Sequence, residues 1–258
     1  MSPTDTMATL VPPACIHRSV YVVELFAGHG HVSDTAAWML NECPRVTVDI
    51  DPSGDPDICM DLAKWDARDS AALRARYPER RPIVFASPPC ESYSRMNTTG
   101  RPDLAAADAL VAKVREISEA IGAVAVFVEN PGTGKLYGRE VMNGGWVPYS
   151  YLVDYCQYGH ILKKTTRIWC SLDLESSGFV PRLCPRTEAG CQAFFKDPWT
   201  GYGSHAGKMV GMRWDERIVV PKQLVVCLMR AALPLVNQRM LAIRDEVARA
   251  NLAARRGR

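Results

Sequence analysis

The chain has 258 residues, of which 47% are hydrophobic and 23% are charged, and its formal net charge is +3. This composition is that of an ordinary soluble globular protein, long enough for one full core and a small appendage. The mildly basic charge is compatible with nucleic-acid binding through a local patch but does not by itself indicate it.

The pattern of apolar residues predicts neither a membrane-spanning segment nor a secretory signal. No apolar run approaches the roughly 18 residues that a membrane helix needs, and residues 1–15 lack a basic region followed by an apolar stretch. The nine cysteines are scattered along the chain, which favours free thiols in a reducing compartment. We therefore expect a protein that is not secreted, cytoplasmic in a bacterium or phage-infected host, or nuclear in a viral or eukaryotic setting.

Residues 1–17 are expected to form a loose N-terminal arm. Four short apolar runs follow, and each ends in a polar or glycine-containing motif. The runs are 21–26, 46–50, 82–86 and 123–128. Between the last two, residues 104–121 carry apolar residues at the three- and four-residue spacing of one helix face. This order predicts an α/β fold with a doubly wound, mostly parallel sheet, and ligands beyond the carboxyl ends of its strands.

The periodic pattern weakens from 171 to about 213, in a stretch that carries Gly, Pro, Trp and two cysteines. We expect a small irregular insert at 171–213. Residues 18–170 and 214–258 then form the main domain, in which a strand-like or helical stretch at 217–235 precedes a closing polar helix at 236–255.

The first motif, ELFAGHG at 24–30, places two glycines where a strand turns into a helix, so that a ligand can approach the backbone closely. Asp49 ends the next apolar run, where a carboxylate can accept both hydroxyls of a ribose, and Asp51 competes for that role. Asp61 is placed to accept from an adenine amino group. The glycine turn alone fits a dinucleotide and an adenosylmethionine about equally, although Ser33 replaces the third glycine of the dinucleotide pattern.

The third and fourth motifs offer the two groups needed to methylate C5 of cytosine. This carbon becomes reactive when a thiolate adds to C6 and a proton is supplied at N3. Cys90 follows two prolines at the end of one apolar run, and Glu129 follows six apolar residues at the end of the next. A buried cysteine is usually inert packing, but the stiff turn before Cys90 and the apolar setting of Glu129 favour a nucleophile and an acid.

The order of these motifs resembles that of the C5-cytosine-specific DNA methyltransferase family, in its compact phage- and virus-type branch. The matching segments are ELFAG at 24–28, SPPC at 87–90, ENP at 129–131, YG at 158–159 and TRIW at 166–169. The resemblance implies the class I adenosylmethionine-dependent fold, DNA (cytosine-5)-methyltransferase activity, S-adenosyl-L-methionine as methyl donor, and double-stranded DNA as substrate with the target cytosine flipped out. The insert at 171–213 then becomes the target-recognition region. We expect a monomer and no membrane partner.

The resemblance also implies a role for each matched residue. Cys90 attacks C6, Glu129 protonates N3 and holds the exocyclic amine, and Arg167 reaches the base O2. The residues expected to bind the methyl donor are Phe26, Ala27, Gly28, Gly30, Asp49, Asp61, Ser87 and Pro88. The residues expected to bind nucleic acid are Ser92, Arg95, Arg101, Lys163 and Lys164, the first three within a segment similar to the family's closing loop.

Some positions depart from the family pattern and leave alternatives open. Glu91 stands where larger members carry Gln, Pro131 replaces Val, and Thr165 stands where a second arginine is expected. The alternatives are the same chemistry on RNA, methylation of cytosine N4 or adenine N6, and transfer of a larger group from a modified donor. The amino-methylating enzymes need an aromatic residue where Cys90 stands, which argues against them.

Cys184, Cys191 and His205, with Cys156 or Cys170, offer side chains of the types that bind zinc. Their spacing differs from that of the common C-x₂₋₄-C knuckles, so the sequence predicts no metal site.

Overall fold

The computed structural model describes residues 16–94, 101–187, 189–191, 193–196, 203–205 and 219–256, without the side chains of 194–196, 203–205, 255 and 256. Most of the expected N-terminal arm and Arg95 lie outside these residues. The described chain begins with a short helix, α1 (Ile16–Ser19), that leads directly into the first strand.

A mixed sheet of seven strands forms the centre of the molecule, in the order β3-β2-β1-β4-β5-β7-β6. Its strands are β1 Val20–Leu25, β2 Arg45–Asp49, β3 Ile58–Cys59, β4 Arg81–Ala86, β5 Ala125–Pro131, β6 Tyr149–Asp154 and β7 Thr165–Cys170. Neighbouring strands from β3 to β5 are parallel, whereas β7 is antiparallel to both β5 and β6. Only β7 therefore runs against the other strands of this sheet, and the expectation of a mostly parallel α/β sheet is confirmed.

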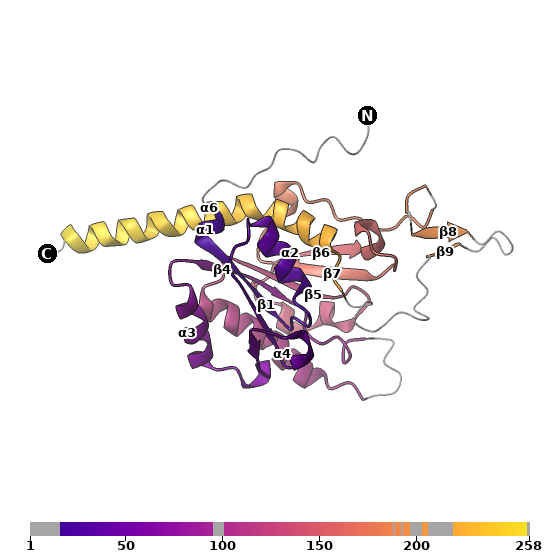
Figure 1. The fold of residues 1–258 in the computed structure, drawn as a ribbon, viewed down its shortest axis with the longest axis horizontal. Helices are drawn as coiled ribbons and strands as arrows, with labels where there is room; N and C mark the ends of the chain where they lie inside the picture. Colours follow the sequence, from indigo (N-terminus) through magenta and orange to yellow (C-terminus); the bar gives the residue numbers. More distant parts are fainter. Residues whose placement is uncertain are drawn as a thin grey trace.

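Helices cover both faces of the sheet (Figure 1). The helices after α1 are α2 His31–Met39, α3 Ala67–Arg76, α4 Leu104–Ile121 and α6 Lys222–Arg256. The short 3-10 helices are η1 Pro52–Gly54, η2 Leu62–Lys64, η3 Lys135–Gly138, η4 Glu140–Met142, η5 Tyr155–Tyr158 and η6 Glu175–Ser177. One apolar core joins α2 and α6 to the sheet, and a second joins α3 and α4 to its other face.

Strands β1, β2, β4 and β5 and helix α4 form where the apolar pattern predicts them, whereas β3, β6 and β7 were not predicted from the sequence. All six residues of β1 are buried, because β2 and β4 flank this strand and helices cover both its faces. Helix α4 has the predicted bounds: Asp103 caps its start by accepting from the Ala106 N–H, and Gly122 ends it in the left-handed conformation. Because the parallel strands end at one edge, the polar motifs that follow them meet there.

The C-terminal region differs from the two segments expected at 217–235 and 236–255. Residues 222–256 form one helix, α6, which continues through Pro234. Its first half is amphipathic and packs on the sheet through side chains such as Leu224, Leu228 and Val236, whereas its second half extends beyond the sheet (Figure 1). By length and composition, the stretch Lys222–Ala254 also passes the test for a membrane span, contrary to the sequence expectation. Of its most apolar window, 44% is buried inside the protein.

The expected insert at 171–213 is joined to the core at its start. Leu172, Leu174 and Phe179 are buried with the helices α2 and α6, because the chain after β7 turns back across this face of the sheet. Further along, the described part contains a two-stranded antiparallel ladder of β8 (Phe194–Lys196) and β9 (Gly203–His205).

Candidate active site

The loop between β1 and α2 is held in a conformation that exposes its backbone. Phe26, Gly28 and Gly30 have φ angles of 58°, 51° and 71°, in the left-handed region. This conformation is costly for Phe26, and such strain is concentrated at ligand sites. The Gly30 N–H donates to the Ala27 carbonyl at 2.8 Å, which closes the turn, and Gly30 caps α2.

Asp49 braces this glycine loop from the neighbouring strand. One carboxylate oxygen accepts from the Gly28 N–H at 2.7 Å, and the other accepts from the Asp51 N–H at 2.8 Å. The following turn packs directly on the loop: a Cβ atom added to Gly54 would lie 1.9 Å from the Gly28 carbonyl oxygen. The sequence pattern placed Asp49 correctly at the end of its strand but gave no sign that Gly54 closes against Gly28.

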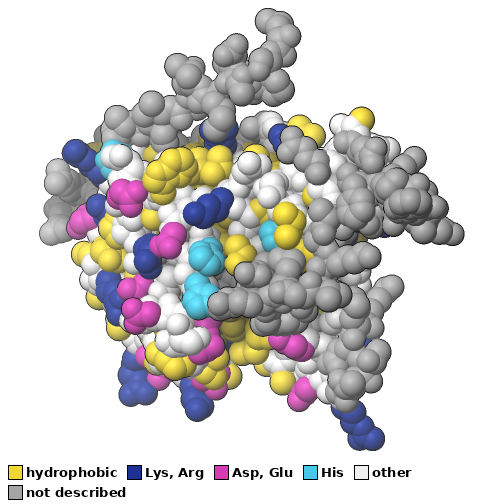
Figure 2. All heavy atoms as spheres, turned by 45° about the vertical axis from the view of Figure 1, so that its right-hand side comes forward, with side chains coloured by type: hydrophobic (Ala, Val, Ile, Leu, Met, Phe, Trp, Pro, Cys, Tyr) yellow, Lys and Arg dark blue, Asp and Glu magenta, His cyan; other side chains and the backbone are white. Residues whose placement is uncertain are grey.

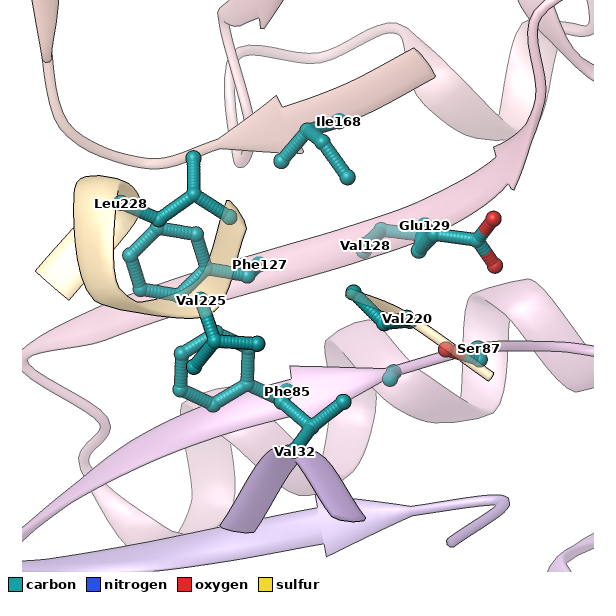
Figure 3. A pocket seen from close by; sticks show the side chains of 11 residues that line it. Val32, Phe85, Ser87, Phe127, Val128, Glu129, Ile168, Val220, Val225 and Leu228 are labelled. Carbon is teal, nitrogen blue, oxygen red and sulfur yellow. The ribbon is translucent and has the colours of Figure 1, made fainter. Parts of the chain in front are cut away.

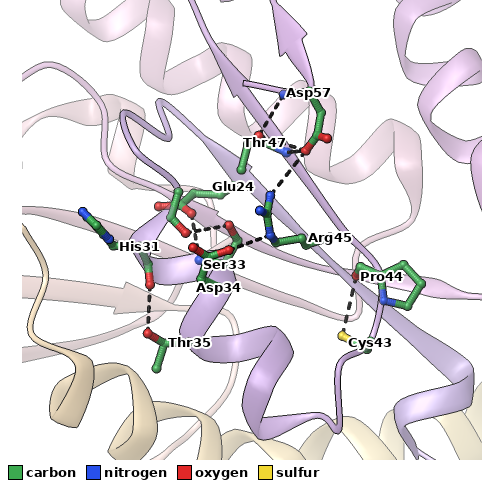
Figure 4. A network of polar contacts seen from close by, with 11 residues as sticks. Glu24, His31, Ser33, Asp34, Thr35, Cys43, Pro44, Arg45, Thr47 and Asp57 are labelled. Carbon is green, nitrogen blue, oxygen red and sulfur yellow. Dashed lines mark hydrogen bonds and ion pairs between the residues drawn. The ribbon is translucent and has the colours of Figure 1, made fainter. Parts of the chain in front are cut away.

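Glu24 is a buried acid beneath the same loop. Its side chain is 6% exposed, and its carboxylate accepts from the Ser33 N–H at 2.7 Å in the first turn of α2 (Figure 4). Burial raises the pKa of Glu24 to about 7, despite this hydrogen bond. The sequence analysis did not single out Glu24. The feature that could have revealed it is an acidic residue within an otherwise apolar run.

A second set of polar contacts ties β2 to its neighbours on the same side (Figure 4). Asp57 accepts from both the Thr47 N–H and its hydroxyl, at 2.8 and 2.9 Å. Arg45 pairs with Asp34 of α2 at 2.6 Å and with Asp57 at 3.6 Å. These contacts fix β2, and therefore Asp49 at its end, relative to α2.

A pocket lies beyond the carboxyl ends of β1, β4 and β5 and encloses about 830 Å³, part of it open to solvent. Backbone and side chains of the glycine loop line one end of it. The turn after β4, with Cys90, and the end of β5, with Glu129, line the other. Its lining residues include Glu24, Phe26, Ala27, Gly28, His29, His31, Ser87, Pro88, Pro89, Cys90, Glu91, Glu129, Pro131, Lys164 and Val220.

The floor next to Glu129 is apolar. Phe85 and Phe127 stack with ring centroids 4.5 Å apart, and Val225 and Leu228 of α6 cover them. Figure 3 shows these side chains gathered on one side, while the Glu129 carboxylate points away from them at the rim. The carboxylate therefore faces the open part of the pocket with a dry surface behind it.

Cys90 is half-buried in a tight turn that is tied to β5. The Tyr93 and Ser94 N–H groups both donate to the Cys90 carbonyl, at 3.0 and 2.8 Å, and the Asn130 amide donates to the Pro88 carbonyl at 2.9 Å. Burial is the main cause that raises the pKa of the Cys90 thiol, the nearby Glu91 raises it further, and the Lys164 cation lowers it.

The Glu129 carboxylate accepts hydrogen bonds from two side chains, Tyr155 and Lys164. Its Oε1 atom accepts from the Tyr155 hydroxyl at 2.9 Å and from Lys164 Nζ at 3.2 Å. The Lys164 ammonium also lies 4.9 Å from the centre of the Tyr155 ring. Burial and the adjacent carboxylate raise the pKa of Tyr155 well above its usual value, so Tyr155 remains a proton donor to Glu129.

A partly buried polar cluster anchors the chain that follows Cys90. The Tyr93 hydroxyl donates to Asp108 of α4 at 2.9 Å, and the Arg139 guanidinium binds both oxygens of the same carboxylate. These contacts lower the pKa of Asp108. The position of Cys90 is thus set from two sides, by β5 through Asn130 and by α4 through Tyr93.

Arg167 does not lie with Cys90 and Glu129. In the β5–β7 ladder Glu129 is opposite Ile168, and Arg167 is opposite Asn130, so Arg167 points to the other face of the sheet. There its guanidinium stacks 4.0 Å from the centre of the Tyr137 ring and donates to the Ser150 hydroxyl at 3.0 Å. The expected contact of Arg167 with the base is not supported by this placement.

The two adjacent lysines also differ from expectation. Lys163 is turned toward the buried Asp154, with Nζ 3.4 Å from Oδ1, so it is engaged inside the protein. Lys164 lies in the pocket, although the sequence suggested a phosphate contact. Arg101 is exposed before α4, as a nucleic-acid contact requires, and Ser92 is half-buried in the turn after Cys90.

Asp61 lies outside the lining of the pocket. Its carboxylate caps η2 by accepting from the Ala63 N–H at 3.0 Å. On the face shown in Figure 2, the described Lys and Arg side chains are interspersed with Asp and Glu and do not gather in one patch. Nucleic-acid binding is therefore not evident from the charge of that face.

The comparisons with known proteins give one significant relative. The chain is 29% identical over 197 residues to a protein of frog virus 3 (isolate Goorha) named "Probable DNA (cytosine-5)-methyltransferase". The alignment covers 71% of this chain and 83% of that protein. No family model matches the chain.

Proposed function

We propose that this protein is a DNA (cytosine-5)-methyltransferase of the C5-cytosine-specific family, in its compact virus-type branch. The observation that carries the proposal is that Cys90, in the turn after β4, and Glu129, near the end of β5, line one pocket beside a strained glycine loop. The similarity to the frog virus 3 protein supports the same activity. The mixed sheet with helices on both faces is compatible with the class I fold of adenosylmethionine-dependent enzymes.

The glycine end of the pocket fits S-adenosyl-L-methionine. The pocket is lined by Phe26, Ala27 and Gly28 of the glycine loop, and the exposed backbone at Gly28 allows close approach. Phe26, Ala27, Ser87 and Pro88 would hold the donor, which supplies an electrophilic methyl group when bound. Each Asp49 oxygen already accepts one backbone N–H and keeps a further lone pair for a ribose hydroxyl.

The other end of the pocket fits the covalent chemistry of a pyrimidine. The Cys90 thiol loses its proton and the sulfur adds to C6, while Glu129 gives a proton to N3, so that the ring becomes an enamine with a nucleophilic C5. After methylation, loss of the C5 proton to a base expels the Cys90 sulfur and restores the aromatic ring. The proton on N3 returns to Glu129.

Lys164 has two functions in this proposal. Its positive charge lies near the thiol and favours the Cys90 thiolate, which burial disfavours. Its hydrogen bond to Oε1, with that from Tyr155, orients the Glu129 carboxyl so that Oε2 faces the base. In this proposal Lys164 is thus a positioning residue, in addition to the nucleic-acid contact expected from the sequence.

We further propose that the substrate is double-stranded DNA with the target cytosine flipped out, at an unstacking cost of a few kcal/mol. Arg101 and Ser92 would contact the DNA backbone, and the segment after Phe179 would recognise the target sequence. We propose a monomer that acts in a reducing compartment, the cytoplasm or the nucleus.

Methyl transfer from labelled adenosylmethionine to DNA, followed by mass analysis of the nucleosides, tests this function. We expect 5-methyl-deoxycytidine. N4-methylcytosine or N6-methyladenine would contradict the Cys90 mechanism, and label in RNA alone would contradict the substrate. A larger group on C5, seen only with a modified donor, would contradict the proposed cofactor.

A further inference from the structure

Three cysteines from separate segments meet at one point near the end of the sheet. Cys156 lies in η5, directly after β6, whereas Cys184 and Cys191 lie in the irregular segment beyond Phe179. Their sulfur atoms all lie within 4.8 Å of one another, and Cys156 and Cys191 are buried. The cluster is separate from the pocket of Cys90, whose lining contains none of the three.

The spacing of these sulfur atoms suits a tetrahedral metal ion. Zn–S bonds of about 2.3 Å at tetrahedral angles place the sulfur atoms roughly 3.8 Å apart. The three sulfur atoms lie within 4.8 Å of one another, which is slightly more than this distance. Small rotations of the cysteine side chains would therefore bring them to the separation that a bound zinc ion requires. Three thiolates leave one position for a fourth ligand.

The sulfur atom of Cys184 accepts a backbone hydrogen bond, as the sulfur atoms of metal-binding cysteines do. The Arg186 N–H donates to Cys184 Sγ at 3.4 Å, in a turn where Arg186 has a left-handed φ of 57°. Backbone N–H groups aimed at sulfur stabilise the thiolate form and orient it toward a metal. The buried Asp154 carboxylate fixes the same turn by accepting from the Cys184 N–H at 2.8 Å.

Further contacts join this segment to η5. The Asp154 N–H donates to the Arg182 carbonyl at 2.9 Å, and the Arg182 N–H donates to the Tyr158 hydroxyl at 3.1 Å. Gln157 donates to the Gly190 carbonyl at 3.1 Å. Residues before and after the cluster are therefore held at fixed positions relative to the core, and the three sulfur atoms lie between them.

We propose that Cys156, Cys184 and Cys191 bind a structural zinc ion. The ion would tie the segment proposed to recognise DNA to the end of the catalytic sheet. Zn²⁺ replaces the three thiol protons, which are released to solvent, and no oxidation or reduction occurs.

Zinc content of the purified full chain, measured by mass spectrometry of the metal after extensive dialysis, tests the site. We expect about one zinc per chain, as a closed structural site retains its ion. Cys184→Ser and Cys191→Ser should each reduce the content at least about tenfold, as loss of a ligand does. Cys227→Ser, a half-buried cysteine of α6 outside the cluster, is the matched control and should retain full zinc.

Cobalt substitution gives a readout that does not depend on folding yield or methyl transfer. The Co²⁺ form should show intense thiolate-to-metal absorption that is lost in Cys184→Ser and kept in Cys227→Ser. A reduced, folded wild-type chain that binds neither metal would overturn the proposal and leave the cluster as apolar packing. A disulfide between two of the three cysteines in protein kept under reducing conditions would overturn it as well. Both results are independent of whether the chain methylates DNA.

Discussion

The two ends of the pocket are built by different means. At the glycine end, Glu24, which lines the pocket, and Asp49, which lies behind the loop outside the pocket lining, accept from backbone N–H groups, so these acids shape the loop. At the other end, Cys90, Glu129 and Lys164 face the pocket with their side chains and interact with one another. The first end holds a shape that a ligand can enter, and the second offers groups that can react.

This difference separates two kinds of failure. Substitutions at the reactive end should remove turnover while the protein stays folded and keeps binding its donor. Substitutions at the glycine end should weaken the loop, and with it donor affinity or stability, with a smaller effect on the chemical step.

The largest effect is expected from Cys90→Ser. Loss of a covalent nucleophile should lower kcat by at least about 10³-fold, with donor binding unchanged by calorimetry. Cys59→Ser, at an exposed thiol of β3, is the control and should keep full activity. Normal turnover in Cys90→Ser would show that Cys90 is not the nucleophile, and it would contradict the assignment of chemistry to this end of the pocket.

Glu129→Gln should lower kcat by about 10²–10⁴-fold, because the amide keeps the hydrogen bonds of the carboxyl but cannot supply a proton to N3. Steady-state kinetics with saturating donor measure this effect. The control is Glu119→Gln, an exposed helix residue paired with Arg115. If Glu129→Gln weakens binding of the donor and leaves kcat unchanged, Glu129 acts in donor binding and not in the chemical step.

Lys164→Gln should shift the pH profile of kcat/KM to higher pH. The pKa of Cys90 is already raised by burial, and removing the cation that lowers it should raise it further. Activity at pH 7 should fall about tenfold for each unit of this shift, with recovery in alkaline buffer. Lys164→Arg should keep much of the wild-type profile. An equal loss at every pH would contradict the role in thiolate formation.

Asp49→Ala should raise the KM for the donor about tenfold and leave kcat close to that of the wild type. The Gly28 and Asp51 N–H groups lose their acceptor, at a cost of about 1–3 kcal/mol. Asp51→Ala is the comparison, since this exposed acid accepts only within its own turn from Ser53. If Asp51→Ala raises the KM for the donor more than Asp49→Ala does, Asp51 and not Asp49 binds the ribose of the donor.

The smallest effect concerns stability. Glu24 has a pKa of about 7 in the folded protein, against 4.5 for an ordinary glutamate, so the folded state holds this proton more tightly than the unfolded state. Stability from this group is therefore full below pH 4.5 and is lost as pH rises through 7, by up to about 3 kcal/mol. Glu24→Gln should match the wild type near pH 5 and exceed it at pH 8 in urea unfolding. If the free energy of unfolding of the wild type and of Glu24→Gln changed in parallel with pH, the raised pKa of Glu24 would be contradicted.

Much of the central sheet could be predicted from the sequence, because apolar runs that end in polar motifs fix both the strands and the edge where the motifs meet. The bounds of α4 followed from its helical spacing, and the structure shows in addition that Asp103 and Gly122 cap its ends. The continuation of α6 through Pro234 did not, since proline usually interrupts a helix and only tertiary packing decides where one persists.

The site was predicted less completely than the fold. The sequence analysis singled out Cys90 and Glu129 because each stands at the end of an apolar run, and the structure places both in the lining of one pocket. The sequence analysis did not bring Tyr155 and Lys164 to Glu129, because they reach it from the residues just after β6 and just before β7, which the antiparallel pairing of these strands places side by side. The same register turns Arg167 to the opposite face, and no short motif records such pairing. The meeting of three distant cysteines depends on loop paths that the sequence pattern does not encode.

Trapping of a covalent complex tests the shared action of Cys90 and Glu129 most directly. Double-stranded DNA that carries 5-fluorocytosine at all cytosines cannot release the sulfur after methylation, since fluorine does not leave C5 as the proton does. Intact mass spectrometry should then show one DNA strand joined to the wild-type chain through Cys90, only when adenosylmethionine is present, and none in Cys90→Ser. Methylated DNA without any such adduct, or an adduct at another residue, would contradict the account.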